Sequence, residues 1–356
     1  MNGQLRDDVV AIAGNARQQF YDARGYGTPT GGNHIEVSRV EAAHLLFRGD
    51  LESVVDSDGS HLDFEAFFVS SASAVDRFGL RFLVYAELRD RGFYLSPARE
   101  GWPGEDTNEW TDLTVYPRGT KPGDGEPAHR IVVVGERTPI PAATLREVTL
   151  AVVDEESEIT YLETGMPTFD GGSTYQPPAS VTGSLIDDRV VVWESPDGFF
   201  DHGFYGQPLT AREAVLDNAV QLSLVEAAGL AVEDHLSLTD EDRLAAEAIC
   251  ERGRAVEGER FDRRLAVYRA LRSQQVVPKT GYKFGADFRT YNTVASVDDL
   301  SHSECLVRVV DADHTFDPRE LSLDVRLAGG VRKRMVFALT GANGNIEWLT
   351  VSRLTP

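Results

Sequence analysis

The chain has 356 residues, 42% of them hydrophobic, and its 57 acidic and 35 basic side chains leave a net charge of −22. This length suits two or more folded domains. The polar start, MNGQLRDDVV, and the lack of a long apolar run predict neither a signal peptide nor a membrane-spanning helix, so we expect a cytoplasmic protein.

The excess of acidic side chains has two interpretations. Binding to a nucleic acid normally draws on a basic surface, so the charge argues against a polyanionic partner. Acidic residues spread along a chain are also typical of a protein from a salt-saturated cytoplasm, where they maintain solubility. Because the Debye length is only about 3 Å at molar salt, repulsion of RNA beyond close contact is screened there. We therefore expect a halophilic protein and keep RNA among its candidate partners.

In chain order, the main feature is an internal repeat. Three segments of the first half recur in the second half in the same order and at similar offsets. They are RGYGTP (24–29) and GFYGQP (203–208), VEAA (40–43) and VEAA (225–228), and VYAELRDRGFYLSP (84–97) and VYRALRSQQVVP (267–278). A twofold repeat of this length indicates a duplicated and fused gene rather than a solenoid.

Each repeat divides into a small α/β N-terminal subdomain and an α/β C-terminal subdomain, so the predicted fold class is mixed α/β. Helical spacing over 82–91 and 263–274 marks the start of each second part, and 239 to about 258 is charged, alanine-rich and helical in character. A stretch rich in Gly, Pro, Ser and Thr links the repeats. The predicted boundaries are 1–81, 82–166, a linker at 167–184, 185–262 and 263–356.

The segment 281–336 carries the candidate chemistry. Its pieces GYKFGADFRTY, SHSECLVRVV and ELSLDVRLAGG are strand-like, and the glycine pair opens a helix-like run, VRKRMVFAL. Tyr291, His302 and Lys333 would then lie at strand ends or at a helix start. A phenol with a pKa of about 10, an imidazole with a pKa of about 6.5 and a fixed cation suit phosphoryl transfer without a metal.

Each of these three residues also has an ordinary explanation. Tyr291 follows the alternating Phe284, Ala286 and Phe288, as a packing tyrosine would. A histidine that opens a strand is usually a surface residue, and a lysine between two arginines means little alone. Only their order along the chain and the sequence motifs around them favour a catalytic interpretation.

The motifs KFGADFRTY, HSE and VRK, in this order, resemble the catalytic half of the archaeal tRNA-splicing endonucleases. The resemblance implies that Tyr291, His302 and Lys333 cleave precursor tRNA without a metal or cofactor, within a restriction-endonuclease-like α/β subdomain. The ribose 2′-hydroxyl would attack the phosphate, leaving a 2′,3′-cyclic phosphate and a 5′-hydroxyl. A phenol takes a proton near neutrality only if a cation lowers its pKa, and Lys333 is the candidate cation. Tyr282 is the alternative base.

The resemblance also implies how the substrate is held. In the family, two arginines grip a bulged base of a bulge–helix–bulge RNA from both faces, and Arg326 and Arg353 occupy the corresponding places. Guanidinium stacking survives heavy screening because it acts at close contact. A basic residue as close to the end of the chain as Arg353 is otherwise usually solvated.

The first repeat is expected to be structural. Aligning the repeats places Tyr116 near the position of Tyr291 and His129 opposite His302, while Glu147 stands where the second repeat has Lys333. An anion cannot stabilise a phosphorane that is becoming more negative.

An acidic turn follows in the first repeat. Its carboxylates, in a predicted hairpin turn, are Asp154, Glu155, Glu156 and Glu158. In the family an acidic loop of this kind inserts into a basic groove of a neighbouring subunit, which implies a homodimer with two active sites. The turn is equally compatible with one more solvated surface of an acidic protein.

Two alternatives stay open. Asp287, Glu304 and Asp324 could hold magnesium in a restriction-type nuclease, although neither Glu304 nor Asp324 has a lysine two residues on. The chain could also be a non-catalytic RNA-binding or assembly subunit. It has no GxxxxGK[ST] or GxGxxG motif, and Cys250 and Cys305 lack metal-ligand spacing, which predicts free thiols and no cofactor.

Overall fold

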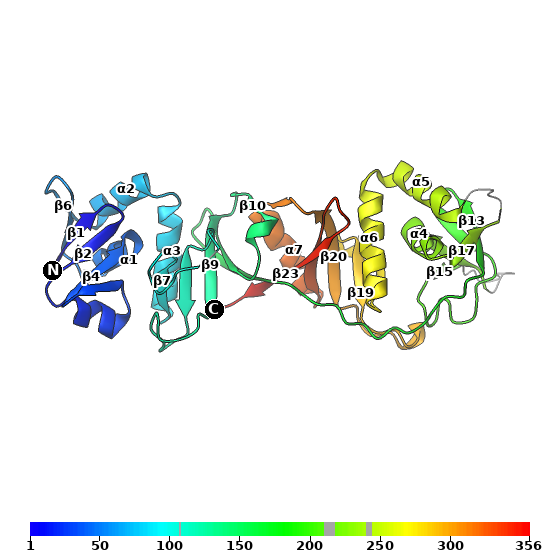
Figure 1. Cartoon of the computed structure of the whole chain (residues 1–356), viewed down its shortest axis with the longest axis horizontal. Coiled ribbons are helices and arrows are strands. Elements are labelled where there is room, and N and C mark those ends of the chain that lie inside the picture. The colour runs from blue at the N-terminus through cyan, green and yellow to red at the C-terminus, as the bar shows by residue number, and fades with distance from the viewer. Residues whose placement is uncertain (107, 210–217, 240–243) are drawn as a thin grey trace. The chain divides into compact units, whose positions relative to one another are not determined.

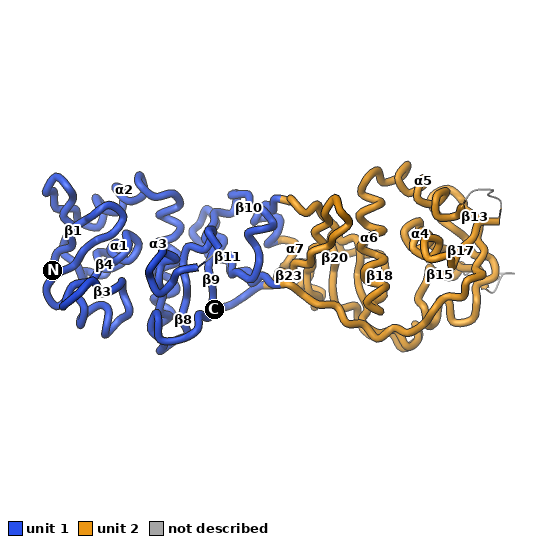
Figure 2. Tube along the Cα trace, viewed as in Figure 1, with its two compact units in different colours: residues 1–165, 315–322, 353–356 blue, residues 166–314, 323–352 orange. Residues whose placement is uncertain are grey.

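The computed structural model describes residues 1–106, 108–209, 218–239 and 244–356 (Figure 1). The chain divides into two compact units, coloured in Figure 2. Unit 1 comprises residues 1–165, 315–322 and 353–356, and unit 2 comprises residues 166–314 and 323–352. Both units combine sheets with helices, which confirms the mixed α/β fold class and the two-repeat organisation. No helix within the described ranges is long and apolar enough to cross a membrane.

Unit 1 holds two sheets. The first has the strand order β3 (Thr28–Gly31), β4 (His34–Ser38), β2 (Val9–Ile12), β1 (Asn2–Arg6), β5 (Ser53–Val55) and β6 (His61–Leu62). The second runs β7 (Tyr94–Pro97), β8 (Leu113–Tyr116), β9 (His129–Gly135), β11 (Thr149–Val153) and β12 (Ile159–Gly165). The helices are α1 (Arg39–Phe47), α2 (Phe64–Ala74) and α3 (Phe78–Asp90), and α3 packs on β7 and β9. A short strand, β10 (Ile140–Pro141), pairs with β21 (Thr315–Phe316).

Unit 2 repeats this plan. Its first sheet has the order β15 (Gln207–Pro208), β16 (Val220–Ser223), β14 (Arg189–Val192), β13 (Val181–Ile186) and β17 (Leu236–Leu238). Its second sheet runs β18 (Val277–Thr280), β19 (Phe288–Tyr291), β20 (Cys305–Asp311), β22 (Arg334–Thr340) and β23 (Ile346–Leu354). The helices are α4 (Leu224–Val232), α5 (Ala245–Glu257), α6 (Arg260–Ser273) and α7 (Pro318–Gly330), and α6 packs on β18, β20 and β22.

The VEAA helices, α1 and α4, begin in the same way. In each, the serine before the helix accepts the amide hydrogen of the glutamate three residues on, and that glutamate accepts the serine amide and the amide of a distant glycine. The sets are Ser38, Glu41 and Gly27, and Ser223, Glu226 and Gly206. Both glycines have φ of 65°, and a side chain at Gly27 would collide with the Glu36 carbonyl. The capping box therefore ties each helix to its RGYG or GFYG turn.

A second duplicated contact joins α3 or α6 to the sheet beneath it. In each repeat a buried aspartate directly before a strand pairs with two arginines near the helix start and accepts an amide hydrogen from the next strand. The sets are Asp112 with Arg77, Arg81 and the Val133 amide, and Asp287 with Arg260, Arg264 and the Val309 amide. Because both repeats keep the same contacts, these aspartates hold the fold together.

The structure corrects the prediction for 318–340. The ELSLDV stretch was expected to be a strand, but it lies in helix α7, with Leu321, Val325 and Ala328 buried at helical spacing. Leu323 fits a period of two in the sequence, yet it is 46% exposed, on the outside of the helix. The glycine pair ends α7 instead of opening a helix, and the apolar run that follows is the central strand β22, buried on both faces.

Other expectations are confirmed. The helices predicted at 82–91 and 263–274 are α3 and α6. The helix expected from Thr239 is α5, which begins at Ala245, while part of the expected range, 240–243, lies outside the described residues. Cys250 and Cys305 are buried free thiols.

Candidate active site

The second sheet of unit 2 brings the three predicted catalytic residues to one edge. Strand β19 is antiparallel to β20, and β20 is parallel to β22. Tyr291 is the last residue of β19, His302 comes shortly before β20 begins, and Lys333 directly precedes β22. The end of β19 and the starts of β20 and β22 therefore meet, and the Glu304 amide donates to the Thr290 carbonyl at 2.9 Å.

Lys333 lies in the turn between α7 and β22, not at a helix start. Its amide donates to Ala328 and so closes the end of α7. Its Nζ donates to the Ser303 carbonyl at 2.7 Å, beside His302, and lies 5.6 Å from the centre of the Phe284 ring. Partial burial and the Arg289 cation lower the pKa of Lys333.

Tyr291 is only 5% exposed. Its ring packs with Phe204, Val277 and Val294, at 5.5 Å between ring centres for Phe204. Arg289 projects from the same face of β19, since it lies two residues earlier, and its guanidinium is 5.7 Å from the ring centre. Sequence reasoning missed Arg289, although its spacing from Tyr291 on a strand was a signal for it.

The other site candidates lie on surface positions. His302 is exposed in a segment without helix or strand. Arg326 is exposed on α7, and Arg353 is exposed in β23. Tyr282, the alternative base, is 87% exposed in a short 3₁₀ turn, Tyr282–Phe284, just before β19.

The acidic turn joins β11 to β12, as predicted for a hairpin. The Asp154 carboxylate accepts the amide hydrogens of Glu156 and Glu158, so it shapes the turn. Glu155 pairs with Arg137 at 2.9 Å, and both side chains are largely exposed.

Sequence analysis also missed a groove of about 800 Å³ in unit 2. Its basic side chains are Arg189, Arg264, Lys279 and Arg289, and Tyr282 lies on its wall. Lys279 is buried beneath it, with Nζ 2.5 Å from the Glu226 carboxylate and hydrogen-bonded to the carbonyls of Phe204 and Gly206. The Lys279 cation holds the pKa of Glu226 below its usual range despite burial.

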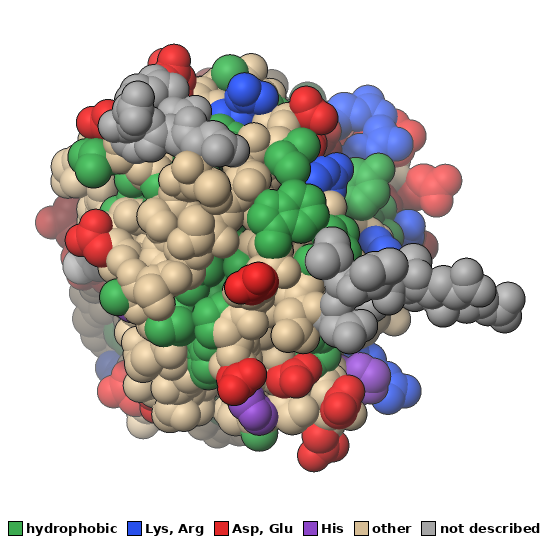
Figure 3. Space-filling view, turned by 90° about the vertical axis from the view of Figure 1, so that its right-hand side faces the viewer, with side chains coloured by type: hydrophobic (Ala, Val, Ile, Leu, Met, Phe, Trp, Pro, Cys, Tyr) green, Lys and Arg blue, Asp and Glu red, His purple; other side chains and the backbone are tan. Residues whose placement is uncertain are grey.

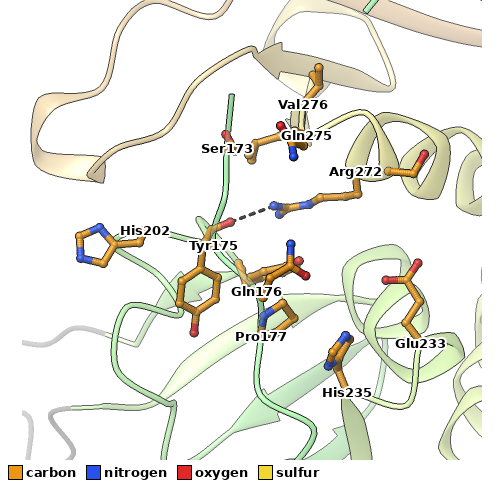
Figure 4. A pocket seen from close by; sticks show the side chains of 14 residues that line it. Ser173, Tyr175, Gln176, Pro177, His202, Glu233, His235, Arg272, Gln275 and Val276 are labelled. Carbon is orange, nitrogen blue, oxygen red and sulfur yellow. Dashed lines mark hydrogen bonds between the residues drawn. The ribbon is translucent and has the colours of Figure 1, made fainter. Parts of the chain in front are cut away.

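A second cavity of unit 2, about 240 Å³, lies beside α6 (Figure 4). Arg272 in its wall stacks over Tyr205 at 4.0 Å and donates to the Gly203 carbonyl. Arg89 makes the equivalent contacts in unit 1, where it stacks over Tyr26 at 4.1 Å and donates to a carbonyl of the RGYG turn. Arg272 therefore belongs to the duplicated framework.

Strand register corrects the alignment of the two repeats. Val133 and Val309 both donate to the duplicated aspartate, so they correspond. Counting back along the strands, His129 corresponds to Cys305 and not to His302.

The same register moves Glu147. Ile131 pairs with Thr149, and its counterpart Val307 pairs with Val336, so counting back along the chain places Glu147 at the position of Arg334. Glu147 therefore corresponds to Arg334 and not to Lys333. The replacement of the Lys333 cation by an anion in the first repeat, which the sequence alignment predicted, therefore does not distinguish the repeats.

Tyr116 does distinguish them. It ends β8 as Tyr291 ends β19, but its hydroxyl donates to the Pro103 carbonyl at 2.5 Å, and burial raises its pKa. Thr114, which holds the position of Arg289, donates its hydroxyl to Gly104. The tyrosine of the first repeat is thus engaged in holding a loop.

Known proteins match this chain along its whole length. The family model for the tRNA intron endonuclease catalytic C-terminal domain matches residues 261–348, and the model for the N-terminal domain matches 1–68 and again 181–250. The chain belongs to the tRNA-splicing endonuclease family. Two curated tRNA-splicing endonucleases, from Haloferax volcanii and Halobacterium salinarum (strain R1), are 54% and 57% identical to it over 100% of both chains. That of Methanococcoides burtonii is 34% identical over 99% of both chains.

Family membership confirms the resemblance drawn from KFGADFRTY, HSE and VRK. The chain is an enzyme that cleaves tRNA introns, and its N-terminal domain occurs twice, as the internal repeat predicts. The relatives of high identity are mostly from halophilic archaea, in keeping with the acidic composition. On the end face of unit 2, acidic side chains are spread out and basic ones lie mainly along one side (Figure 3).

Proposed function

We propose that the enzyme cuts both intron boundaries of precursor tRNA in a bulge–helix–bulge motif, without a metal, in the cytoplasm. The observation that supports this proposal is that the end of β19 lies beside the start of β20, and the start of β20 beside that of β22, since Tyr291, His302 and Lys333 are at or next to these strand ends. Phosphoryl transfer by such a group depends on positioning and on charge stabilisation.

In the proposed reaction the ribose 2′-oxygen attacks phosphorus while the bond to the 5′-oxygen breaks. Tyr291 takes the 2′-hydroxyl proton, and the Arg289 guanidinium lies 5.7 Å from the centre of its ring. His302 gives a proton to the departing 5′-oxygen, and the Lys333 ammonium stabilises the non-bridging oxygens. The products are a 2′,3′-cyclic phosphate and a 5′-hydroxyl.

The contacts of the acidic residues favour this route over a carboxylate-held magnesium. Both oxygens of Asp287 are engaged, by Arg260, Arg264 and an amide, and Asp112 makes the same contacts in the non-catalytic repeat. Asp324 pairs with Arg308. These carboxylates have structural partners of their own.

The test is cleavage of an end-labelled RNA with two three-nucleotide bulges around a short helix, in high potassium chloride with EDTA. We expect cuts in both bulges that leave cyclic phosphate ends. A fully paired RNA of the same length is the control and should stay intact. Cleavage only after magnesium is restored would support the carboxylate nuclease, and binding without cleavage in either condition would support an assembly subunit.

Arg326 and Arg353 are each proposed to contact a bulged base through guanidinium stacking. Both side chains are exposed, and stacking on the face of a base acts at short range. The bulge would thus be read by shape.

The acidic turn is proposed to assemble a homodimer. Asp154 accepts two amide hydrogens within the turn, which leaves Glu155 and Glu156 at its tip, where they would meet a basic groove of the other copy. Opposite charges of this kind set register and orientation at an interface. Each turn would enter the groove of the other copy, with the first repeat serving as structural support.

We expect the double substitution Glu155→Lys and Glu156→Lys to convert the dimer into monomers, because it places like charges against the groove. Light scattering after gel filtration in high potassium chloride measures the mass. Asp58→Lys, in an exposed turn of the β5–β6 hairpin, is the matched control and should leave the mass unchanged. A variant that remains dimeric would show that another surface holds the copies together.

A further inference from the structure

Tyr282 is an exposed aromatic side chain in the turn that joins β18 to β19, at the end of β19 opposite Tyr291, and this turn reaches the proposed catalytic edge through the contact of Phe284 with Lys333. At 87% it has the largest exposed fraction among the large hydrophobic side chains of the described residues. Two residues later Phe284 turns inward, and its ring lies 5.6 Å from the Lys333 Nζ. The same short turn therefore presents one ring to Lys333 and another to solvent.

The turn that carries Tyr282 is held by its backbone. The Phe284 amide donates to Gly281 at 2.8 Å, the Gly281 amide donates to the Asp287 carbonyl at 3.1 Å, and the Tyr282 amide donates to the Thr280 hydroxyl at 3.3 Å. Gly285 closes the turn with φ of 68°, a conformation that glycine adopts without strain. The exposed ring thus stands on a fixed support, so little backbone entropy is lost when a ligand stacks on it.

In the first repeat, an aromatic side chain of the equivalent connection is buried. The connection between β7 and β8 is longer than the one between β18 and β19, and its Trp102 is folded in to 8% exposure, near Arg99. At this connection between two strands, the largely exposed aromatic side chain belongs to the repeat that carries Lys333.

We propose that Tyr282 is a stacking platform for an unpaired base of the RNA, next to the phosphate that is cut. Single-stranded bases bind proteins largely by stacking on aromatic rings, at about 1–3 kcal/mol per base. The groove wall that holds Tyr282 also carries Arg289, whose charge suits the adjoining phosphates. Such stacking is independent of sequence and persists in high salt, as an enzyme that reads the shape of a bulge requires.

The proposal rests on cleavage at this edge, and it assigns Tyr282 to substrate binding instead of to proton transfer. These roles separate in the variants. A base needs the hydroxyl, so Tyr282→Phe would abolish cleavage if Tyr282 took the proton. A platform needs only the ring, so Tyr282→Phe should cleave normally.

The experiment measures KM and kcat on the two-bulge RNA in high potassium chloride for Tyr282→Ala, Tyr282→Phe and Tyr282→Trp. We expect alanine to raise KM about tenfold with kcat within about twofold, and the two aromatic variants to keep KM. Trp193→Ala, an aromatic residue of unit 2 that is 42% exposed, is the matched control and should behave as wild type. Melting temperatures check that each variant folds.

A direct readout does not depend on cleavage. RNA carrying 2-aminopurine in a bulge should lose fluorescence on binding to wild type in EDTA, and lose less on binding to Tyr282→Ala. Equal quenching and equal KM would overturn the proposal, as would loss of activity in Tyr282→Phe. A Tyr282→Ala chain that becomes monomeric would place the ring at the dimer interface and also overturn it. If wild type quenches but never cleaves, the proposed reaction fails while the platform stands.

Discussion

Lys333→Ala is expected to lower kcat for precursor tRNA cleavage by about 10²–10³, with a much smaller change in KM. Removal of one group that stabilises a developing oxyanion typically has an effect of this size, about 2.7–4 kcal/mol in the barrier. Lys333 is suited to the task because the Ser303 carbonyl and the Phe284 ring fix its ammonium before substrate arrives. The measurement is single-turnover cleavage at saturating enzyme.

Two controls separate chemistry from folding. Lys121→Ala removes a lysine of unit 1 that donates to the Asp22 carbonyl, and it should cleave at the wild-type rate. Lys333→Arg keeps the charge but exchanges a compact ammonium for a planar fork, so we expect partial activity. A fully active Lys333→Ala enzyme would remove the lysine from the mechanism.

The dependence on pH follows from the direction of the Lys333 shift. Burial and Arg289 lower its pKa, so the ammonium is present below that value and is lost as pH rises through it. The cleavage rate should therefore decline at a lower pH than it would with a lysine of ordinary pKa. Arg289→Ala should move that decline to higher pH, whereas Arg254→Ala, an exposed arginine on α5, should leave it in place.

The sequence predicted the repeat and the edge of the site because both rest on local patterns. The repeat is recognisable in short segments that have kept similar sequences in both copies. These segments are RGYGTP and GFYGQP, each hydrogen-bonded to a buried glutamate, and the two VY helices. Tyr291, His302 and Lys333 lie in three strand-flanking motifs, and antiparallel and parallel pairing of neighbouring strands brings such ends together.

What the sequence did not predict depends on packing. Leu321, Leu323 and Val325 fit a strand period, whereas Leu321, Val325 and Ala328 fit a helix period, and only burial selects the helix. Equating Glu147 with Lys333 failed because letters were aligned without strand register. Lys279 and Glu226 are 53 residues apart, and no local sequence pattern at either residue predicts their ion pair.

Lys279→Met is expected to destabilise unit 2 by about 3–5 kcal/mol, because it leaves the Glu226 carboxylate buried without its cation. Met resembles lysine in length and shape, so packing is largely kept and the charge is the main change. Thermal unfolding in high potassium chloride, followed by calorimetry, should show unit 2 melting first. The double variant with Glu226→Gln should recover part of the loss, since an unpaired charge is no longer buried.

The sign of the pH dependence tests the cause. In wild type Lys279 lowers the pKa of Glu226, so the stability contributed by the pair is present above the unfolded carboxyl pKa and is lost as pH falls through the folded value. Without the cation, Glu226 should resemble Glu41 of the first repeat, where Ser96 holds the position of Lys279 and burial raises the carboxyl pKa. The deficit of Lys279→Met should then shrink as pH is lowered toward the pKa of the buried carboxyl, because protonation removes the buried charge. Ser96→Ala should show no such trend, and a deficit in Lys279→Met that is the same at every pH would assign the loss to packing.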